Sequence, residues 1–232
     1  MAEGESTYLK VDIIHRLAER FGYRRYLEFA TGTTGYLYNL IDRDRFEECR
    51  RLLYNAPADF ADGCAVDYRT EGLDISDLLA AIARERGRFD IILVDPYHGY
   101  RESRRDLDAA LALLEPGGAL VVHDCLPPTE ELARPDFQEG AWCGVTYKAY
   151  LDFVIAHPEL PYVTVDTDYG CGVVRKVASL LNGRALSGDQ FAAWRGFGDD
   201  YSAAWRYFTA HREALLNLID VDAFVAGRDG LG

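Results

Sequence analysis

Two acids and two histidines follow apolar runs that have the composition of buried strands. Asp95 and His98 come directly after the run FDIILV, and His123 and Asp124 come at the end of the next predicted strand. If these strands are neighbours in a parallel sheet, they lie about 5 Å apart. That spacing suits acid–base chemistry or a shared divalent cation. The alternative is structural: the aspartates cap loops and helix ends, and the histidines are hydrogen-bonded core residues.

A turn rich in glycine and threonine follows the first predicted strand, in the run LEFATGTTGY (27–36). Glycines there let the backbone approach a ligand and turn into a helix, whose first N–H groups are free donors. Ala30, Gly32 and Gly35 give only A-x-G-x-x-G, which falls short of the dinucleotide fingerprint. The carboxylate of Glu28 would repel a pyrophosphate and suits a cationic or amine-bearing ligand. A strand-to-helix turn without a ligand stays the alternative.

The elements that would position these residues alternate between helical and strand-like patterns, which is typical of an α/β layer fold. Helices are expected at 8–21, with Ser6 or Thr7 as N-cap, at 75–86, 102–114 and 145–156, and from 189 onward. A further short helix is expected after the glycine turn and ends at Leu40. Strands are expected at 24–29, 64–70, 89–94, 119–123, 162–165 and 172–175, with a turn at 116–118. The stretch 45–54 fits either a strand or a helix. Ligands of such sheets bind outside the carboxyl ends of the strands, where strand order reverses.

Composition and charge exclude several classes of protein. Among the 232 residues 25 are basic and 38 acidic, and the formal charge of -13 disfavours binding to nucleic acid or to a membrane surface. The apolar fraction of 49% suffices for one core, and no run approaches the ~18 apolar residues of a membrane span. The polar start is not a signal peptide. Five cysteines without CxxC spacing predict reduced thiols and a cytoplasmic location.

Five pieces of the sequence stand in a fixed order: LEFATGTTGY, SDLL (76–79), FDIILVDPYHGY (89–100), RDL (105–107) and PGGALVVHDC (116–125). Together they resemble class I S-adenosylmethionine-dependent methyltransferases, and most closely the branch that reads FIDGxHxYE…RDL…LxPGGxIxxHD. The pieces WCGVTYKA (142–149) and VDTDYGCG (165–172) also resemble that branch. The resemblance implies one doubly wound, mostly parallel, seven-stranded Rossmann-like sheet with helices on both faces and an antiparallel last strand.

The resemblance also implies which residues bind S-adenosylmethionine. The glycine turn would wrap the methionine moiety, and an acid after the second strand, Glu48 or else Glu47, would bind the ribose. A polar pair ahead of the third helix would contact adenine, and the acid ending the fourth strand would stand beside the sulfonium. The implied cofactor-binding set is Glu28, Ala30, Thr31, Gly32, Gly35, Glu48, Ser76, Asp77 and Asp95.

The activity that the resemblance implies is methyl transfer to an oxygen, such as a hydroxyl of a small natural product or sugar. His98 lies three residues beyond Asp95 and is the expected general base, with His123 as the alternative. In metal-dependent catechol-type relatives, the metal ligands correspond to Asp95, Asp124 and Cys125. Because Mg²⁺ prefers oxygen ligands, Cys125 leaves two possibilities open: an ion such as Mg²⁺ on the two carboxylates, or catalysis without a metal.

Two further functions fit the same residues. One is a catalytically silent methyltransferase-like binding protein, and the other is a nicotinamide-dependent oxidoreductase, against which Glu28 and the missing first glycine argue. The loop 127–142 and the C-terminal tail are expected to form the acceptor pocket. Aromatic residues that would suit a ring-bearing acceptor are Tyr97, Tyr100, Trp142 and Tyr147.

The last part of the chain, 189–232, predicts a helical extension with a stripe of aromatic residues. We expect this extension to pack on the domain formed by residues 1–188, whose core spans 22–176, or against the partner of a homodimer. In either arrangement it buries an apolar surface that a free helix would leave exposed.

Overall fold

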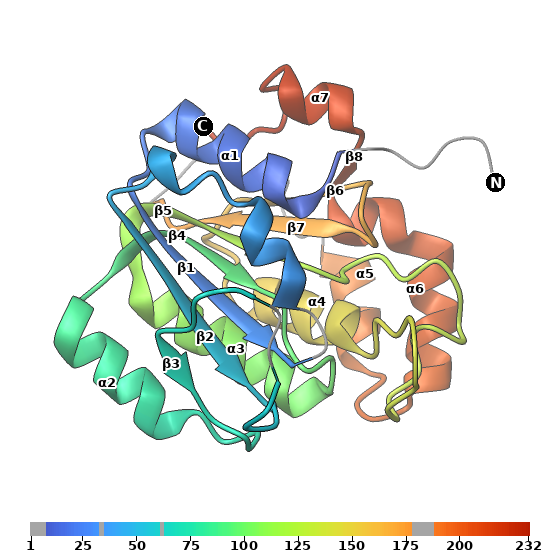
Figure 1. Cartoon of the computed structure of the whole chain (residues 1–232). Coiled ribbons are helices and arrows are strands. Elements are labelled where there is room, and N and C mark those ends of the chain that lie inside the picture. Colours follow the sequence, from blue (N-terminus) through green and yellow to red (C-terminus); the bar gives the residue numbers. More distant parts are fainter. Residues whose placement is uncertain (1–7, 33–34, 61–62, 178–187) are drawn as a thin grey trace, which may run out of the picture.

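The computed structural model describes residues 8–32, 35–60, 63–177 and 188–232, and it shows one sheet between two layers of helices (Figure 1). The strands are β1 (Arg25–Thr31), β2 (Glu48–Tyr54), β3 (Tyr68–Arg69), β4 (Phe89–Val94), β5 (Leu114–Val122), β6 (Tyr162–Val165), β7 (Cys171–Arg175) and β8 (Leu218–Ile219). The helices are α1 (Lys10–Phe21), α2 (Ser76–Arg86), α3 (Tyr100–Leu113), α4 (Thr146–Ala156), α5 (Gly188–Arg195), α6 (Tyr201–Leu216) and α7 (Val221–Val225). Two short 3-10 helices, η1 (Gly35–Leu40) and η2 (Arg43–Arg45), lie between β1 and β2.

The strand order of the sheet is β3-β2-β1-β4-β5-β7-β6-β8. The strands from β3 to β5 pair in parallel, whereas β7 runs antiparallel to both β5 and β6. These findings confirm the doubly wound sheet, the central position of the run 89–94 and the antiparallel seventh strand. The predicted count of seven strands is wrong, because β8 adds an eighth beside β6. A strand of two residues is too short to leave a periodic pattern in the sequence.

Each face of the sheet carries its own apolar core. On one face, α1, η1 and α7 contribute Leu17, Tyr38 and Phe224 to a cluster with alternate residues of the strands (Figure 1). On the other face, the larger cluster joins the sheet to the helices from α2 to α6. The central strand β4 is apolar almost throughout because both of its faces are covered. Among the described residues, no helix is long and apolar enough to cross a membrane.

Some predicted boundaries shift once pairing is known. The first helix begins at Lys10 rather than at Tyr8, and its predicted N-cap lies outside the described residues. The ambiguous stretch 45–54 contains β2, which pairs with β1 along its whole length. Of the predicted strand 64–70, only Tyr68–Arg69 pairs with β2.

The C-terminal helices pack on α4 through aromatic side chains. The ring of Tyr147 in α4 lies 4.6 Å from that of Phe208 and 5.7 Å from that of Trp205, both in α6. The indole of Trp194 in α5 is buried, and its Nε1 donates a hydrogen bond to Asp152 Oδ1 at 2.8 Å. Much of the aromatic stripe is thus buried within this chain, and the homodimer stays a prediction.

Candidate active site

Three strand ends meet at the point where the strand order reverses. Asp95 directly follows β4, and its backbone N–H donates to the Phe29 carbonyl of β1 at 3.0 Å. His123 directly follows β5, and its backbone N–H donates to the Val94 carbonyl of β4 at 3.1 Å. The ladders therefore continue past the last residue of each strand. They fix both residues at the carboxyl edge beside the switch point between β1 and β4, where ligands of open parallel sheets bind.

Several polar residues at this edge have a left-handed backbone, among them His98, Asp124 and Asp168. The φ angles are +62° at His98, +61° at Asp124 and +47° at Asp168. Such conformations cost free energy in residues other than glycine, and they cluster at functional sites. Neighbouring loops hold them: the His98 carbonyl accepts a hydrogen bond from Val145 N at 2.9 Å.

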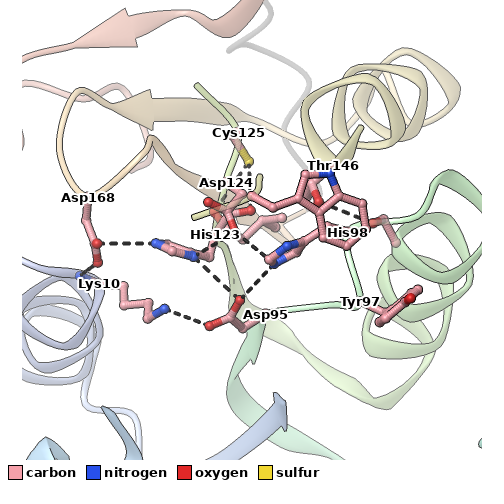
Figure 2. A network of polar contacts seen from close by, with 12 residues as sticks. Lys10, Asp95, Tyr97, His98, His123, Asp124, Cys125, Thr146 and Asp168 are labelled. Carbon is pink, nitrogen blue, oxygen red and sulfur yellow. Dashed lines mark hydrogen bonds and ion pairs between the residues drawn. The ribbon is translucent and has the colours of Figure 1, made fainter. Parts of the chain in front are cut away.

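Two carboxylates and two imidazoles meet at the strand ends (Figure 2). Nε2 of His98 lies 2.9 Å from Oδ2 of Asp124 and 3.5 Å from Oδ1 of Asp95. Nδ1 of His123 lies 3.1 Å and 3.5 Å from the same two oxygens. The structure thus brings together all four residues that the sequence singled out at these positions, and all four side chains are buried.

Two further residues complete the cluster, and the sequence analysis missed both as site residues. Lys10, the first residue of α1, places its Nζ 2.6 Å from Asp95 Oδ2 (Figure 2). Asp168, in the loop between β6 and β7, lies 3.3 Å through Oδ1 from His123 Nε2. Its other oxygen accepts a hydrogen bond from Lys10 N at 3.0 Å. The run VDTDYGCG, which contains Asp168, is one of the pieces that resemble the family, but nothing in the sequence indicated a partner for the Asp168 side chain.

The electrostatics of the cluster follow from its burial and its charges. Burial disfavours charge on the imidazoles, but the carboxylates of Asp124 and Asp95 outweigh it and raise the His98 pKa to about 9. The His123 pKa is raised well above its ordinary value for the same reason. Burial opposes ionisation of Asp95 too, yet Lys10 and His123 hold its pKa well below the usual range. The cluster therefore consists of ionised carboxylates that favour the protonated forms of Lys10 and of both imidazoles.

A cavity of about 410 Å³ opens onto the cluster. Lys10, the four clustered acid and histidine residues, Asp168, Tyr169 and the segment 137–143 line it. Of the four aromatic residues proposed to suit an acceptor, Trp142 lines this cavity. Tyr97 is not in the lining, but its ring centroid lies 5.7 Å from that of Trp142. Tyr147 packs against α6 instead, and Tyr100 Oη donates to Asp152 Oδ2 at 2.8 Å.

On the neighbouring strand β1, Glu28 has partners within the protein. Its Oε2 accepts a hydrogen bond from Tyr26 Oη at 2.7 Å, and its Oε1 lies 3.6 Å from Nε of Arg51, which is opposite Glu28 in β2. Burial raises the Glu28 pKa to about 7. The acid is thus part of a buried network rather than an open carboxylate of the glycine turn.

Comparisons with known proteins give this site its context. A family model described as a methyltransferase domain matches residues 4–125, just over half of the chain. The chain belongs to this methyltransferase family. No protein with a curated function matches its sequence.

Solved structures of methyltransferases share the fold. An O-methyltransferase from Bacillus cereus, in complex with SAH, is 19% identical with a TM-score of 0.51, and the match covers 75% of this chain and 82% of that one. The O-methyltransferase TomG from Streptomyces achromogenes, which takes part in tomaymycin synthesis and was solved with SAM, is 18% identical with a TM-score of 0.52. That match covers 72% of this chain and 78% of that one. At these identities the likeness concerns the fold alone.

The glycine turn of this methyltransferase follows β1 at the carboxyl edge of the sheet. Ala30 and Thr31 end β1 and are buried, and Gly35 begins η1. A Cβ on Gly32 would lie 3.0 Å from the Asn55 carbonyl oxygen and from Ala56 Cα, so the turn passes close to the end of β2. Residues 33–34 lie outside the described part of the chain.

The predicted ribose acid is misplaced. Glu48 is the first residue of β2 and is opposite Arg25, the first residue of β1. Since the two strands are parallel, Glu48 lies at the amino edge of the sheet, where it forms ion pairs with Arg25 and Arg50. The polar residue that follows β2 at the carboxyl edge is Asn55, with φ of +49° and a backbone N–H donated to the Gly72 carbonyl. The error arose because the sequence did not show where β2 ends.

The pair predicted to contact adenine begins the helix α2. Ser76 and Asp77 form the first turn of α2, which follows the edge strand β3, and both are exposed. Asp74 Oδ1 accepts hydrogen bonds from Ser76 N at 3.0 Å and from Ser76 Oγ at 2.7 Å. The helix start is therefore fixed while both side chains remain accessible to a ligand.

The clustered donors also fit a divalent cation. Asp95, His98 and Asp124 each bring one donor atom within 4.8 Å of the others. Oδ1 of Asp95, Nε2 of His98 and Nδ1 of His123 are buried and form no hydrogen bonds, although they face one another at close range. Buried polar atoms left without such bonds call for a specific explanation, and an ion is one. The residues present thus fit a metal in this methyltransferase.

Gly144 lies close against the backbone of His98, so that a larger residue would not fit there. Gly144 has φ of +57°, and a Cβ there would collide with the carbonyl oxygen and Cβ of His98. We expect Gly144→Ala to lower the free energy of unfolding by about 2–4 kcal/mol, as measured by urea denaturation. Gly22→Ala is the control, because Gly22 has φ of +71° with open space around it. It should cost only the backbone term of about 1–2 kcal/mol; equal losses in the two variants would contradict the collision with His98.

Proposed function

We propose that this methyltransferase transfers the methyl group of S-adenosylmethionine to a hydroxyl oxygen of a small molecule, of the natural-product or sugar class. The observation that carries the proposal is the cavity at the switch point. There the carboxylates of Asp95, Asp124 and Asp168 lie with Lys10 and two imidazoles in a chain of the methyltransferase family. These carboxylates favour positive charge beside them, such as that of a sulfonium or a metal ion.

In the proposed reaction the acceptor oxygen attacks the methyl carbon, the carbon–sulfur bond breaks, and S-adenosylhomocysteine leaves. The acceptor hydroxyl loses its proton, and we assign that proton to Nε2 of His98, which points to the centre of the cluster. Asp124 and Asp95 then stabilise the imidazolium. Holding the two reactants in line supplies much of the rate, since little other covalent chemistry is needed.

The cofactor-binding residues are proposed at the same edge of the sheet. The turn of Thr31 and Gly32 would hold the methionine moiety, and Ser76 and Asp77 would contact adenine. For the ribose we assign Asn55 in place of Glu48, since its amide stands at the carboxyl end of β2 and can both donate and accept hydrogen bonds.

Asp95 and Asp124 are the residues that would hold a divalent cation. When bound, such a cation would orient the acceptor hydroxyl and add positive charge that lowers the pKa of nearby acids. That charge would offset the carboxylates that raise the His98 pKa, which agrees with an imidazole base working near neutral pH.

Calorimetric titration with S-adenosylmethionine and S-adenosylhomocysteine tests the proposal. We expect saturable binding of both, and its absence at about 1 mM ligand would exclude the function. Asn55→Gly keeps a residue that tolerates positive φ but removes the amide, so it should weaken binding about tenfold. Glu48→Gln, at the opposite edge, is the control and should leave the affinity unchanged. The reverse pattern would restore Glu48 as the ribose ligand.

A catalytically silent binding protein is the second candidate, and one observation favours it. Two acids expected near the cofactor already have cationic partners, since Arg51 faces Glu28 and Lys10 pairs with Asp95. The two functions differ in turnover. Formation of S-adenosylhomocysteine with any member of a panel of hydroxylated acceptors supports the enzyme, whereas cofactor binding without product across the panel supports the silent protein.

A further inference from the structure

The donor set at the carboxyl edge is unusual for an ion that prefers oxygen. Around the two carboxylate oxygens of Asp95 and Asp124 lie two imidazole nitrogens, at 2.9–3.5 Å. Neighbouring ligands of an octahedral ion with bonds of about 2.1 Å lie about 3 Å apart, so the separations of these atoms match those around a bound dication. Either imidazole is close enough to be a ligand.

A second contact distinguishes the two histidines. Nε2 of His123 lies 3.3 Å from the carboxylate of Asp168, so Nδ1 is the nitrogen turned toward Asp95 and Asp124 (Figure 2). Nε2 faces the Asp168 carboxylate without a hydrogen bond in this structure. A carboxylate at that nitrogen is usual for histidines that bind metals, where it orients the ring and makes the ligand more basic. Asp168 is itself anchored by the backbone N–H of Lys10.

His98 has a different setting. It lies on the loop after β4 with a left-handed backbone, and its ring meets the edge of Trp142 at a centroid distance of 5.5 Å in the wall of the cavity. His123, by contrast, continues the ladder of β5. The more rigidly held imidazole is the better ligand, and the one facing the acceptor cavity is the better base.

We propose that Asp95, Asp124 and His123 form a metal centre that selects first-row transition-metal dications such as Mn²⁺ over Mg²⁺, with Asp168 as the positioning residue of His123. The proposal rests on the cation site of the proposed function and names its metal class. Imidazole nitrogen is a good ligand for transition metals, whereas Mg²⁺ is held by oxygen atoms. One nitrogen in place of an oxygen therefore shifts the preference.

The test is metal binding without any methyl donor. Mn²⁺ alone is titrated into the metal-free protein while the free ion is followed by electron paramagnetic resonance, and Mg²⁺ is added in competition. We expect Mn²⁺ to bind at least about tenfold more tightly than Mg²⁺. Equal affinities, or no Mn²⁺ binding, would overturn the proposal. A negative result for the metal does not decide whether S-adenosylmethionine binds, because each titration is done without the other ligand.

Spin-echo spectroscopy then identifies the nitrogen ligand. Bound Mn²⁺ should show coupling to ¹⁴N in the wild type and in His98→Asn, and the coupling should disappear in His123→Glu. The His123→Glu variant should also lose most of the preference for Mn²⁺. Asp168→Asn keeps a residue that tolerates the left-handed backbone and should weaken Mn²⁺ binding about tenfold or more. Coupling that is lost in His98→Asn instead would make His98 the ligand and overturn the assignment. Far-UV circular dichroism checks the fold of each variant, and the wild-type coupling needs no substitution at all.

Discussion

Replacing His98 with alanine is expected to lower turnover by about 100-fold or more while cofactor affinity stays near that of the wild type. The reason is geometric. Nε2 of His98 points to the space between Asp95 and Asp124, where the hydroxyl of the proposed acceptor would lie to lose its proton. The proposed binding residues for the cofactor stand on other loops, after β1, β2 and β3.

The left-handed backbone of His98 complicates the alanine variant, because alanine is strained at φ of +62°. His98→Asn is the matched variant, since asparagine tolerates this conformation and lacks a base of suitable pKa. His157→Asn, at a histidine that faces Glu159 on the surface, is the control and should keep full activity. Turnover is measured as S-adenosylhomocysteine formed with the acceptor found by screening. Full activity of His98→Asn would show that the base is another group, with His123 next to be tested.

The residues at the ends of β4 and β5 were predictable because their signal is local. An apolar run such as FDIILV is buried on both faces, and the polar residues after it must then lie at the carboxyl edge. The neighbouring position of β4 and β5 brought Asp95, His98, His123 and Asp124 together as expected. For the same reason the central sheet and its switch point could be inferred from the sequence alone.

The second strand was obscure because its charges are neutralised by pairing. In the run ECRRLLY, Arg51 is fully buried and faces Glu28 across the strands, while Arg50 pairs with Glu48 and Asp67. Because three of the seven residues are charged, the hydrophobicity of this run shows neither the period of a strand nor that of a helix. The misplacement of the ribose ligand followed from that ambiguity, since an acid can be assigned to a strand end only when the end is known.

Lys10 and Asp168 could not be assigned because their partners are distant in sequence. Lys10 is 85 residues from Asp95, and they meet because α1 packs on one face of the sheet with its first residue at the carboxyl edge. A lysine at the start of a helix ordinarily points into solvent, so its type and position gave no warning of burial.

The second large effect is expected at Lys10. Lys10→Met should lower the free energy of unfolding by about 3–5 kcal/mol, as measured by urea denaturation, because it leaves the buried Asp95 carboxylate without its cation. The ammonium and the carboxylate are 2.6 Å apart with side-chain exposures of 4% and 3%, so little water reaches the carboxylate to replace the lost partner. Methionine keeps most of the volume of the side chain, and the effect is therefore electrostatic rather than a cavity.

The charges around the pair predict that Lys10→Met and Asp95→Asn lower the stability by different amounts. This difference separates the loss of a charge from a poor fit of methionine. Asp124 and Asp168 also contribute to the raised pKa of Lys10, so the lysine lies among three carboxylates. Asp95→Asn leaves Lys10 with two of them and should cost less than Lys10→Met. The double variant should be more stable than the sum of the single losses predicts, because no isolated charge remains on either side. Glu19→Gln, which breaks an exposed ion pair of the same helix with Arg16, should cost less than about 1 kcal/mol. Additive losses in the double variant would mean that the pair is not coupled, and that the burial of Lys10 has another cause.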